Sequence, residues 1–248
     1  MRRAQLTGSL LRASRPLLRI NLGQYARDVR EAPFPIDSAE SRIDGPFADR
    51  LLFIGDVGVM GYGVQRQGMT VCQRTAQRVA GHRGRGCEWE SIAAPDLTVS
   101  RLRKRATLGS VSIDLALLMI GVPDVLLATR GGAWASDLQA VVATIRAQHG
   151  GITPIVFAGI PPLADFRPIH PVARDLIRRQ TRMLNDATEQ LAATLEHAAY
   201  LPFPPLPLGK SLIQDAFSWR TLHQVWAAHL APAAFELLDQ SDVTSTRG

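Results

Sequence analysis

Residues 51–64 have the sequence LLFIGDVGVMGYGV, an uninterrupted apolar run followed by a glycine-rich turn. A short continuous apolar run is typical of a strand that is buried on both faces of a parallel sheet. The turn behind it contains Asp56 and several closely spaced glycines. Ligands of open α/β sheets bind beyond the carboxyl ends of the strands, so this turn marks the first candidate region for a site.

Four further segments stand in order behind this one. Three combine an apolar run with a following loop, namely Trp89–Val99, Ile113–Val125 and Ile155–Leu163, and the fourth is the short segment Asp215–Ser218. Stretches with helical spacing of apolar residues lie between them. Strands that alternate with helices and are joined by short loops predict a parallel sheet with helices on both faces.

In this order the five segments resemble the sequence blocks of the SGNH (GDSL-type) hydrolase superfamily, from about Leu51 to Leu230. The resemblance implies a three-layer α/β/α sandwich with a parallel, flavodoxin-like five-stranded sheet. It also implies an esterase or lipase ancestry, because members of that family carry Gly-Asp-Ser in the first turn and attack an acyl carbonyl with the serine.

The resemblance places the family's catalytic positions at Val57, Asp96, Pro123, Asp215 and Ser218. Val57 stands at the position of the nucleophilic serine, and Ser218 at that of the histidine base. Asp96 and Pro123 replace the glycine and the asparagine that donate to the oxyanion, and Asp215 keeps the carboxylate that orients the base. A valine has no nucleophilic atom, and a hydroxyl does not replace an imidazole as base. Loss of one oxyanion donor costs about 10²–10³ in turnover. We therefore expect no residue to act by the usual serine–histidine mechanism.

These substitutions favour a non-catalytic protein that binds an acyl, lipid or glycan ligand, or a protein partner, through the inherited cleft. The alternative is an esterase or acyltransferase with a rewired active site. Asp56, Asp124 and His170 are candidates to line the cleft, and His170 is the better candidate for a new base, because His223 is expected to be a surface or core histidine. Clustered aspartates could bind Mg²⁺ or Ca²⁺. The family's own turns use Asp56 and Asp124 structurally, so we expect no metal and no cofactor.

The chain divides into a basic arm with a proline-rich linker (1–47), the hydrolase-like domain (48–238) and a disordered tail (239–248). Within the domain, strands are predicted at 51–54, 87–92, 113–122, 153–160 and 199–203. Helices are predicted at 69–80, 98–108, 136–149, 174–197 and 221–238. The helix at 69–80 is expected to end at Gly81, and the helix at 136–149 to be capped by Ser136.

The amino-terminal arm is strongly basic, since residues 2–27 contain six arginines and no acid. Arginines interrupt its apolar residues, so it does not fit a signal peptide, and no run reaches the ~20 apolar residues of a membrane span. We expect a cytoplasmic protein. Two interpretations of the arm stay open: a segment packed on the domain, or a basic amphipathic segment that makes peripheral contact with an anionic membrane through residues 2–27.

The net charge of +6 raises the question of nucleic acid, and the basic segment Arg101–Arg105 is the obvious candidate. No nucleic-acid motif accompanies it and few aromatic residues lie nearby, so a solvated helix face is the simpler interpretation and no specific nucleic acid is expected. The two cysteines, Cys72 and Cys87, leave a disulfide open, although reduced thiols are the simpler expectation in a reducing compartment.

Overall fold

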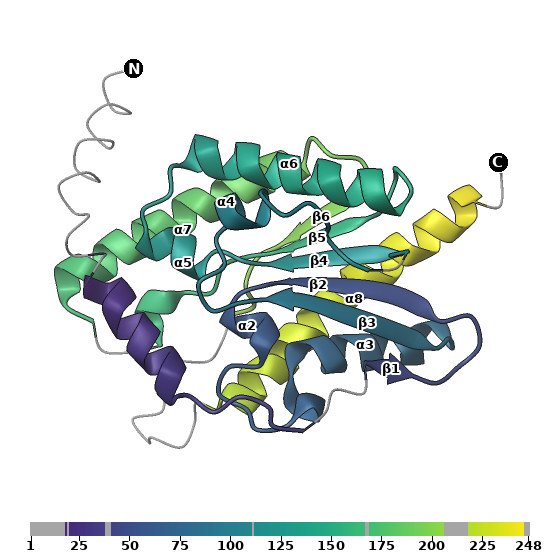
Figure 1. The fold of residues 1–248 in the computed structure, drawn as a ribbon, viewed down its shortest axis with the longest axis horizontal. Helices are drawn as coiled ribbons and strands as arrows, with labels where there is room; N and C mark the ends of the chain where they lie inside the picture. The colour runs from purple at the N-terminus through teal and green to yellow at the C-terminus, as the bar shows by residue number, and fades with distance from the viewer. Residues whose placement is uncertain are drawn as a thin grey trace.

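The computed structural model describes residue 18 and residues 20–37, 41–110, 112–166, 169–205 and 218–245. These residues form one six-stranded sheet between two layers of helices (Figure 1). The strands are β1 (Arg42–Ile43), β2 (Asp49–Gly55), β3 (Cys87–Ala93), β4 (Leu115–Met119), β5 (Ile155–Ala158) and β6 (Ala198–Leu201). Their order across the sheet is β1-β3-β2-β4-β5-β6.

Strands β2 to β6 are all parallel, and their order is the flavodoxin-like order that the sequence predicts. The sheet differs from the predicted five strands by one. The short strand β1 lies in the predicted linker and pairs antiparallel with β3, with Ile43 opposite Cys87. Without β1, the outer edge of β3 would expose unpaired backbone groups, so the linker here completes the sheet.

The helices cover both faces of the sheet (Figure 1). They are α2 (Val57–Met60), α3 (Val71–Arg83), α4 (Val99–Leu102), α5 (Val122–Leu126), α6 (Gly131–His149), α7 (Pro171–Ala192) and α8 (Trp219–Ser245), with the short 3₁₀ helices η1 (Gln67–Met69) and η2 (Leu163–Asp165). Helices α4, α6 and α7 share one apolar core with the sheet, and α3 and α8 share the other. A further helix spans residues 20–31.

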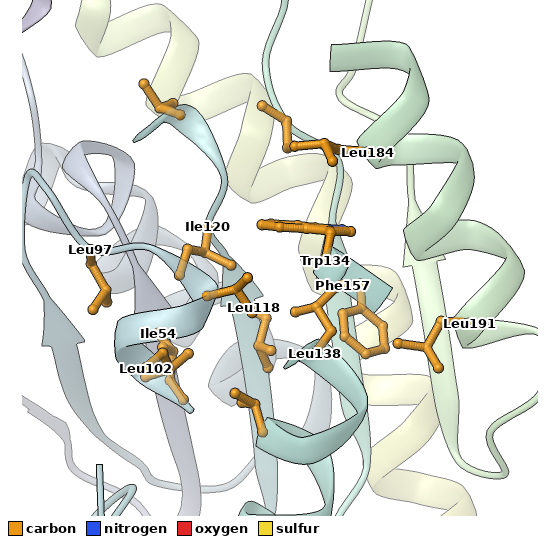
Figure 2. Close-up of a cluster of buried hydrophobic side chains, with 14 of the residues drawn as sticks. Ile54, Leu97, Leu102, Leu118, Ile120, Trp134, Leu138, Phe157, Leu184 and Leu191 are labelled. Carbon is orange, nitrogen blue, oxygen red and sulfur yellow. The ribbon is translucent and has the colours of Figure 1, made fainter. Parts of the chain in front are cut away.

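Strand β2 contributes to both cores, which explains its unbroken apolar sequence. Leu52 and Ile54 face the core beneath α6 and α7, whereas Leu51 and Phe53 face the core beneath α3 and α8, and all four are fully buried. Figure 2 shows Ile54 and Leu118 from neighbouring strands packed toward Leu102 of α4. The α6–α7 layer is fixed by the indole of Trp134, which donates a hydrogen bond to Thr188 Oγ1 at 2.8 Å.

Several predicted helix ends are wrong. Gly81 lies inside α3, which ends at Gly84 in the left-handed conformation (φ 61°). Helix α4 ends at Leu102 rather than near Leu108, and the buried Leu108 is held instead by the Gln148 side chain, which accepts from its N–H. Helix α6 begins at Gly131, five residues before Ser136. These ends depend on contacts distant in sequence.

The predicted disordered tail is also corrected, because α8 continues through the described residues to Ser245. Two of its acids hold this extension in place. Arg83 of α3 forms ion pairs with Asp49 of β2 (2.8 Å), with Asp242 (2.8 Å) and with Asp239. The Arg83 side chain is only 2% exposed, so this network ties the end of α8 to the sheet.

The part of the amino-terminal arm that the structure describes packs on the domain. Leu18 is 1% exposed within the α6–α7 core, and Leu22 and Tyr25 pack against that core. Residues 1–17 and 19, which carry five of the arm's six arginines, lie outside the described residues. Among the described helices, none has the length and apolar character needed to cross a bilayer. Cys72 and Cys87 are both buried and carry free thiols.

Candidate functional site

A pocket of about 810 Å³ opens at the carboxyl edge of the sheet. Its wall combines the β2–α2 turn, the first turns of α5 and α8, the loop around η2 and the helix at 20–31. This is the region between β2 and β4 where the strand order reverses, the place where open α/β sheets bind ligands. The wall is mostly apolar, with side chains that include Val57, Val122, Leu126, Phe166, Leu222 and Trp226.

Asp56 lies in the wall of this pocket. Its Oδ2 atom accepts hydrogen bonds from the backbone N–H groups of Gly121 (3.0 Å) and Val122 (2.9 Å), and its Oδ1 atom accepts from the N–H of Gly58 (3.4 Å). Burial raises the pKa of Asp56 to about 6, although the backbone hydrogen bonds act in the opposite direction. Because its acceptors are used by backbone groups, Asp56 lines the pocket as a structural carboxylate.

The structure places the other two predicted cleft residues elsewhere. Asp124 is 1% exposed, and its carboxylate accepts from the Val99 N–H (3.0 Å) and from the Thr129 hydroxyl (2.8 Å). Burial raises the pKa of Asp124 to about 6. It joins α5 to the start of α4 and is not part of the pocket wall. His170 is exposed and caps α7 by accepting from the Val172 N–H at 3.4 Å, so it also lies outside this wall.

His223 is the histidine that the fold brings to the pocket. It is 1% exposed, its Nδ1 atom accepts from the Val71 N–H at 3.2 Å, and its Nε2 atom lies 3.0 Å from the Tyr62 carbonyl oxygen, to which it donates. Burial lowers the pKa of His223, and the positive charge of Arg74 lowers it as well. The neutral ring is therefore fixed between two backbone groups. Of the two expectations for His223, a surface or a core histidine, the structure has the core one, and His223 rather than His170 lies at the pocket.

The helix at 20–31 forms one side of the pocket, which the sequence did not predict. The Tyr25 hydroxyl donates to the Pro95 carbonyl oxygen at 2.7 Å, in the loop after β3. Burial raises the pKa of this phenol, as does the nearby charge of Asp56. Arg27, Asp28 and Glu31 of the same helix also line the pocket, so its rim is charged where its interior is apolar.

The GDSL-like Lipase/Acylhydrolase family model matches residues 53–236, nearly three quarters of the chain. The chain belongs to this family. None of the curated proteins matches it.

Solved structures of GDSL-type proteins share the fold. A lipase from a goat rumen metagenome is 12% identical with a TM-score of 0.56, over 76% of this chain and 98% of its own. A member of the lipolytic G-D-S-L family from Veillonella parvula is 13% identical with a TM-score of 0.54, over 73% of this chain and 97% of its own. For a GDSL-like lipase from Bacteroides ovatus the identity is 16% and the TM-score 0.51. That match covers 79% of this chain but only 55% of the Bacteroides protein.

Among the described positions that the sequence resemblance assigns to the family's catalytic residues, Val57 alone lies in the pocket wall. Asp96 is exposed in the loop after β3 and forms an ion pair with Arg101. Pro123 is buried in the first turn of α5, and Ser218 is exposed just before α8. Asp215 lies outside the described residues. In this GDSL-like chain the pocket therefore presents an alkyl side chain at the position that the sequence resemblance assigns to the nucleophile.

The pocket wall offers little else for acyl transfer. None of the wall residues that the structure describes is a serine, threonine, cysteine or lysine. His223 and Asp56 are hydrogen-bonded to backbone groups, so neither is placed to take a proton from a substrate. Among the described residues, no group of three or more His, Cys, Asp or Glu could hold a metal ion. The arrangement provides a volume and an apolar surface rather than reactive groups.

Proposed function

We propose that this GDSL-like protein is a non-catalytic binder that holds the acyl or alkyl chain of a lipid in its pocket. The observation that supports this most directly is Val57, which presents a methyl-bearing side chain to a pocket of about 810 Å³ at the position of the family's nucleophile. Pockets of ≈ 300–1,000 Å³ with mainly apolar walls are typical of sites for small molecules.

An acyl chain fits the wall better than a glycan does. Trp226, Leu222 and Phe166 would remove apolar chain surface from water, which contributes about 25 cal/mol for each Å² buried. A sugar would have to place its hydroxyl groups against the same side chains, and a buried hydroxyl without a hydrogen bond costs about 1–3 kcal/mol. Beside this apolar part of the wall, the Tyr25 phenol and the His223 ring are already bonded to backbone groups, and the charged side chains of the pocket lie at its rim.

The charged rim of the pocket restricts the head group that the ligand can carry. Arg27, Asp28 and Glu31 line the same pocket from the helix at 20–31. The carboxylate of Glu31 disfavours a free fatty acid, because it would repel the carboxylate of that ligand. An uncharged head group, as in an ester, an ether or an alcohol, fits this rim without such repulsion.

The test is calorimetric titration with 1-O-dodecylglycerol, whose ether linkage no hydrolase of this family can cleave. We expect saturable binding by the full-length protein. Val57→Trp fills the pocket and should weaken binding at least about tenfold, and Ala32→Trp, at another position of the wall, should do the same. Val172→Trp adds the same side chain on an exposed face of α7 and should leave binding unchanged.

Equal binding by Val57→Trp, Ala32→Trp and the unchanged protein would contradict the proposal, because the ligand would then lie elsewhere. Absence of saturable binding by the unchanged protein would also contradict it. The rival function, an esterase or acyltransferase with a rewired site, predicts stoichiometric labelling of one serine by a fluorophosphonate probe. We expect no labelling, since the described pocket wall contains no serine.

A further inference from the structure

A second hollow of about 500 Å³ lies where η1 meets the first turns of α3 and α8. We call it the arginine pocket after Arg66, Arg74 and Arg220, which line it together with Gln67, Gln73 and Asp37. Arg66 and Arg220 are exposed, and Arg74 is half-buried. Three guanidinium groups, from the residue before η1, from α3 and from α8, therefore converge on one concave surface that carries one carboxylate among the described residues.

Within the described residues, no acid forms an ion pair that would neutralise the arginines of this pocket. No ion pair joins Arg66, Arg74 or Arg220 to any described acid. The one acid in the wall, Asp37, accepts a hydrogen bond from the Gln67 N–H at 2.8 Å. The Nε atom of Arg74 is buried and has no hydrogen-bond partner among the residues that the structure describes. A buried donor without a partner is uncommon and calls for a ligand or water that would satisfy it.

Some arginines elsewhere in the fold are paired with acids. Arg83 pairs with three aspartates, and Arg101 and Arg103 of the basic segment pair with Asp96 and Asp137. In the arginine pocket the charges oppose one another instead. Burial lowers the pKa of Arg74, and the positive charges of Arg220 and Arg78 lower it further. Like charges held together without a counter-ion are unfavourable unless an anion binds between them.

We propose that the arginine pocket binds the phosphate group of a phosphate monoester. The planar guanidinium fork matches phosphate oxygens with two parallel hydrogen bonds, which makes arginine the usual residue for this contact. Three arginines and one aspartate give the wall a net charge that matches a dianionic phosphate. The side-chain amides of Gln67 and Gln73 add further N–H donors, and the volume leaves room for the organic part of the ester.

This site is separate from the pocket at the carboxyl edge of the sheet, which we call the acyl pocket after the ligand proposed for it. Residues of α8 line both pockets. On α8, Trp219 lines the acyl pocket and Arg220 lines the arginine pocket. His223 also lines the acyl pocket, and the charge of Arg74 lowers its pKa. A phosphate could therefore come from a soluble ester or from a phospholipid head group. The chemistry of recognition is the same for both, and the proposal does not depend on what the acyl pocket binds.

The test titrates the full-length protein with glycerol 3-phosphate by calorimetry and sediments it with phosphatidylcholine vesicles that contain or lack phosphatidic acid. Arg220→Gln and Arg66→Gln remove exposed charges and leave the packing intact. Arg74→Gln removes the half-buried one, and its fold is checked by circular dichroism. Arg105→Gln is the matched control, because Arg105 is exposed and lies outside the arginine pocket.

We expect saturable binding of at least one phosphate source, weakened about tenfold or more by Arg220→Gln and by Arg74→Gln, and changed less than about twofold by Arg105→Gln. Binding of glycerol 3-phosphate without sedimentation identifies a soluble ester. Sedimentation only with phosphatidic acid, lost in Arg220→Gln, identifies a lipid head group. Binding of neither source overturns the proposal. Equal weakening of phosphate binding by Arg105→Gln and Arg220→Gln also overturns it, because it indicates a diffuse basic surface.

Discussion

The Oδ2 atom of Asp56 lies 2.9 Å from the backbone nitrogen of Val122, which donates a hydrogen bond to it. This bond joins the turn after β2 to the turn after β4, the two neighbouring strands between which the connection order reverses. The same carboxylate oxygen also accepts from Gly121. Asp56, which precedes Val57, thus holds the two turns together.

Removal of the Asp56 carboxylate should destabilise the fold. Asp56→Ala leaves three backbone N–H groups without an acceptor, and we expect a loss of about 3 kcal/mol in the free energy of unfolding. Asp56→Asn keeps one oxygen for Gly121 and Val122, so its loss should be about 1 kcal/mol. Urea unfolding measures both. Losses that are equal in the two variants would show that these hydrogen bonds are not the cause.

The pKa of Asp56 predicts a pH dependence of stability. Its pKa is about 6 in the fold and 3.8 ordinarily, so the folded state binds its proton more tightly than the unfolded chain does. The resulting stabilisation is fully present below about pH 4 and is lost as the pH rises through about 6, by an amount on the order of 3 kcal/mol. Asp124 acts in the same direction, whereas the lowered pKa of His223 acts oppositely.

A comparison of the unchanged chain with Asp56→Asn isolates the contribution of Asp56 to the pH dependence of stability. The difference in unfolding free energy between the unchanged chain and Asp56→Asn should vary between pH 4 and pH 7, since only the unchanged chain carries this titrating group. His223 contributes equally to both proteins and cancels, whereas Asp124 cancels only in part, because the charge of Asp56 raises its pKa. A difference that stays constant over this range would contradict the raised pKa.

His223 should remain a neutral ring protonated on Nε2 over the physiological range, because Nδ1 accepts from Val71 and Nε2 donates to Tyr62. The ¹⁵N chemical shifts of the imidazole report this tautomer directly. We expect His223→Leu to lower the unfolding free energy by about 2 kcal/mol, since it leaves two buried backbone groups without partners. A ring that titrates near 6.5 would contradict this arrangement.

The Arg83 network should contribute more to the free energy of unfolding than surface ion pairs do. Arg83→Met leaves the buried Asp49 without its closest partner, and we expect a loss of about 3 kcal/mol in unfolding free energy. Arg179→Met is the control: it breaks an exposed pair with Asp175 and should cost less than about 0.5 kcal/mol. Similar losses in the two variants would show that the end of α8 is not held by Arg83.

The sheet could be predicted from sequence because its information is local. An unbroken apolar run such as Leu51–Ile54 indicates a strand buried on both faces, and β2 lies where it was expected. The position of the pocket at the carboxyl edge followed from the parallel order of the strands. Val57 lies in the pocket wall, as the resemblance of its sequence block implies. The extension of α8 did not follow, because Asp239 and Asp242 look like an ordinary polar tail until Arg83 is placed beside them.

The details of the site depend on contacts that no local pattern encodes. Tyr25 reaches Pro95 across 70 residues of sequence, and nothing in an arginine- and leucine-rich arm predicts that this helix closes a pocket. His223 meets Val71 over 152 residues, and the spacing from Ser218 indicated only that it faces away from that position. Arg74 and Arg220 approach each other from opposite ends of the domain.

The central claim is that this GDSL-like pocket binds an acyl chain without cleaving it, and release of p-nitrophenolate from p-nitrophenyl decanoate tests it most directly. We predict saturable binding of the ester with release no faster than that of a heat-denatured control, since Val57 supplies no nucleophile. A stoichiometric burst of p-nitrophenolate, or sustained turnover above the control, would contradict the claim and establish a rewired active site.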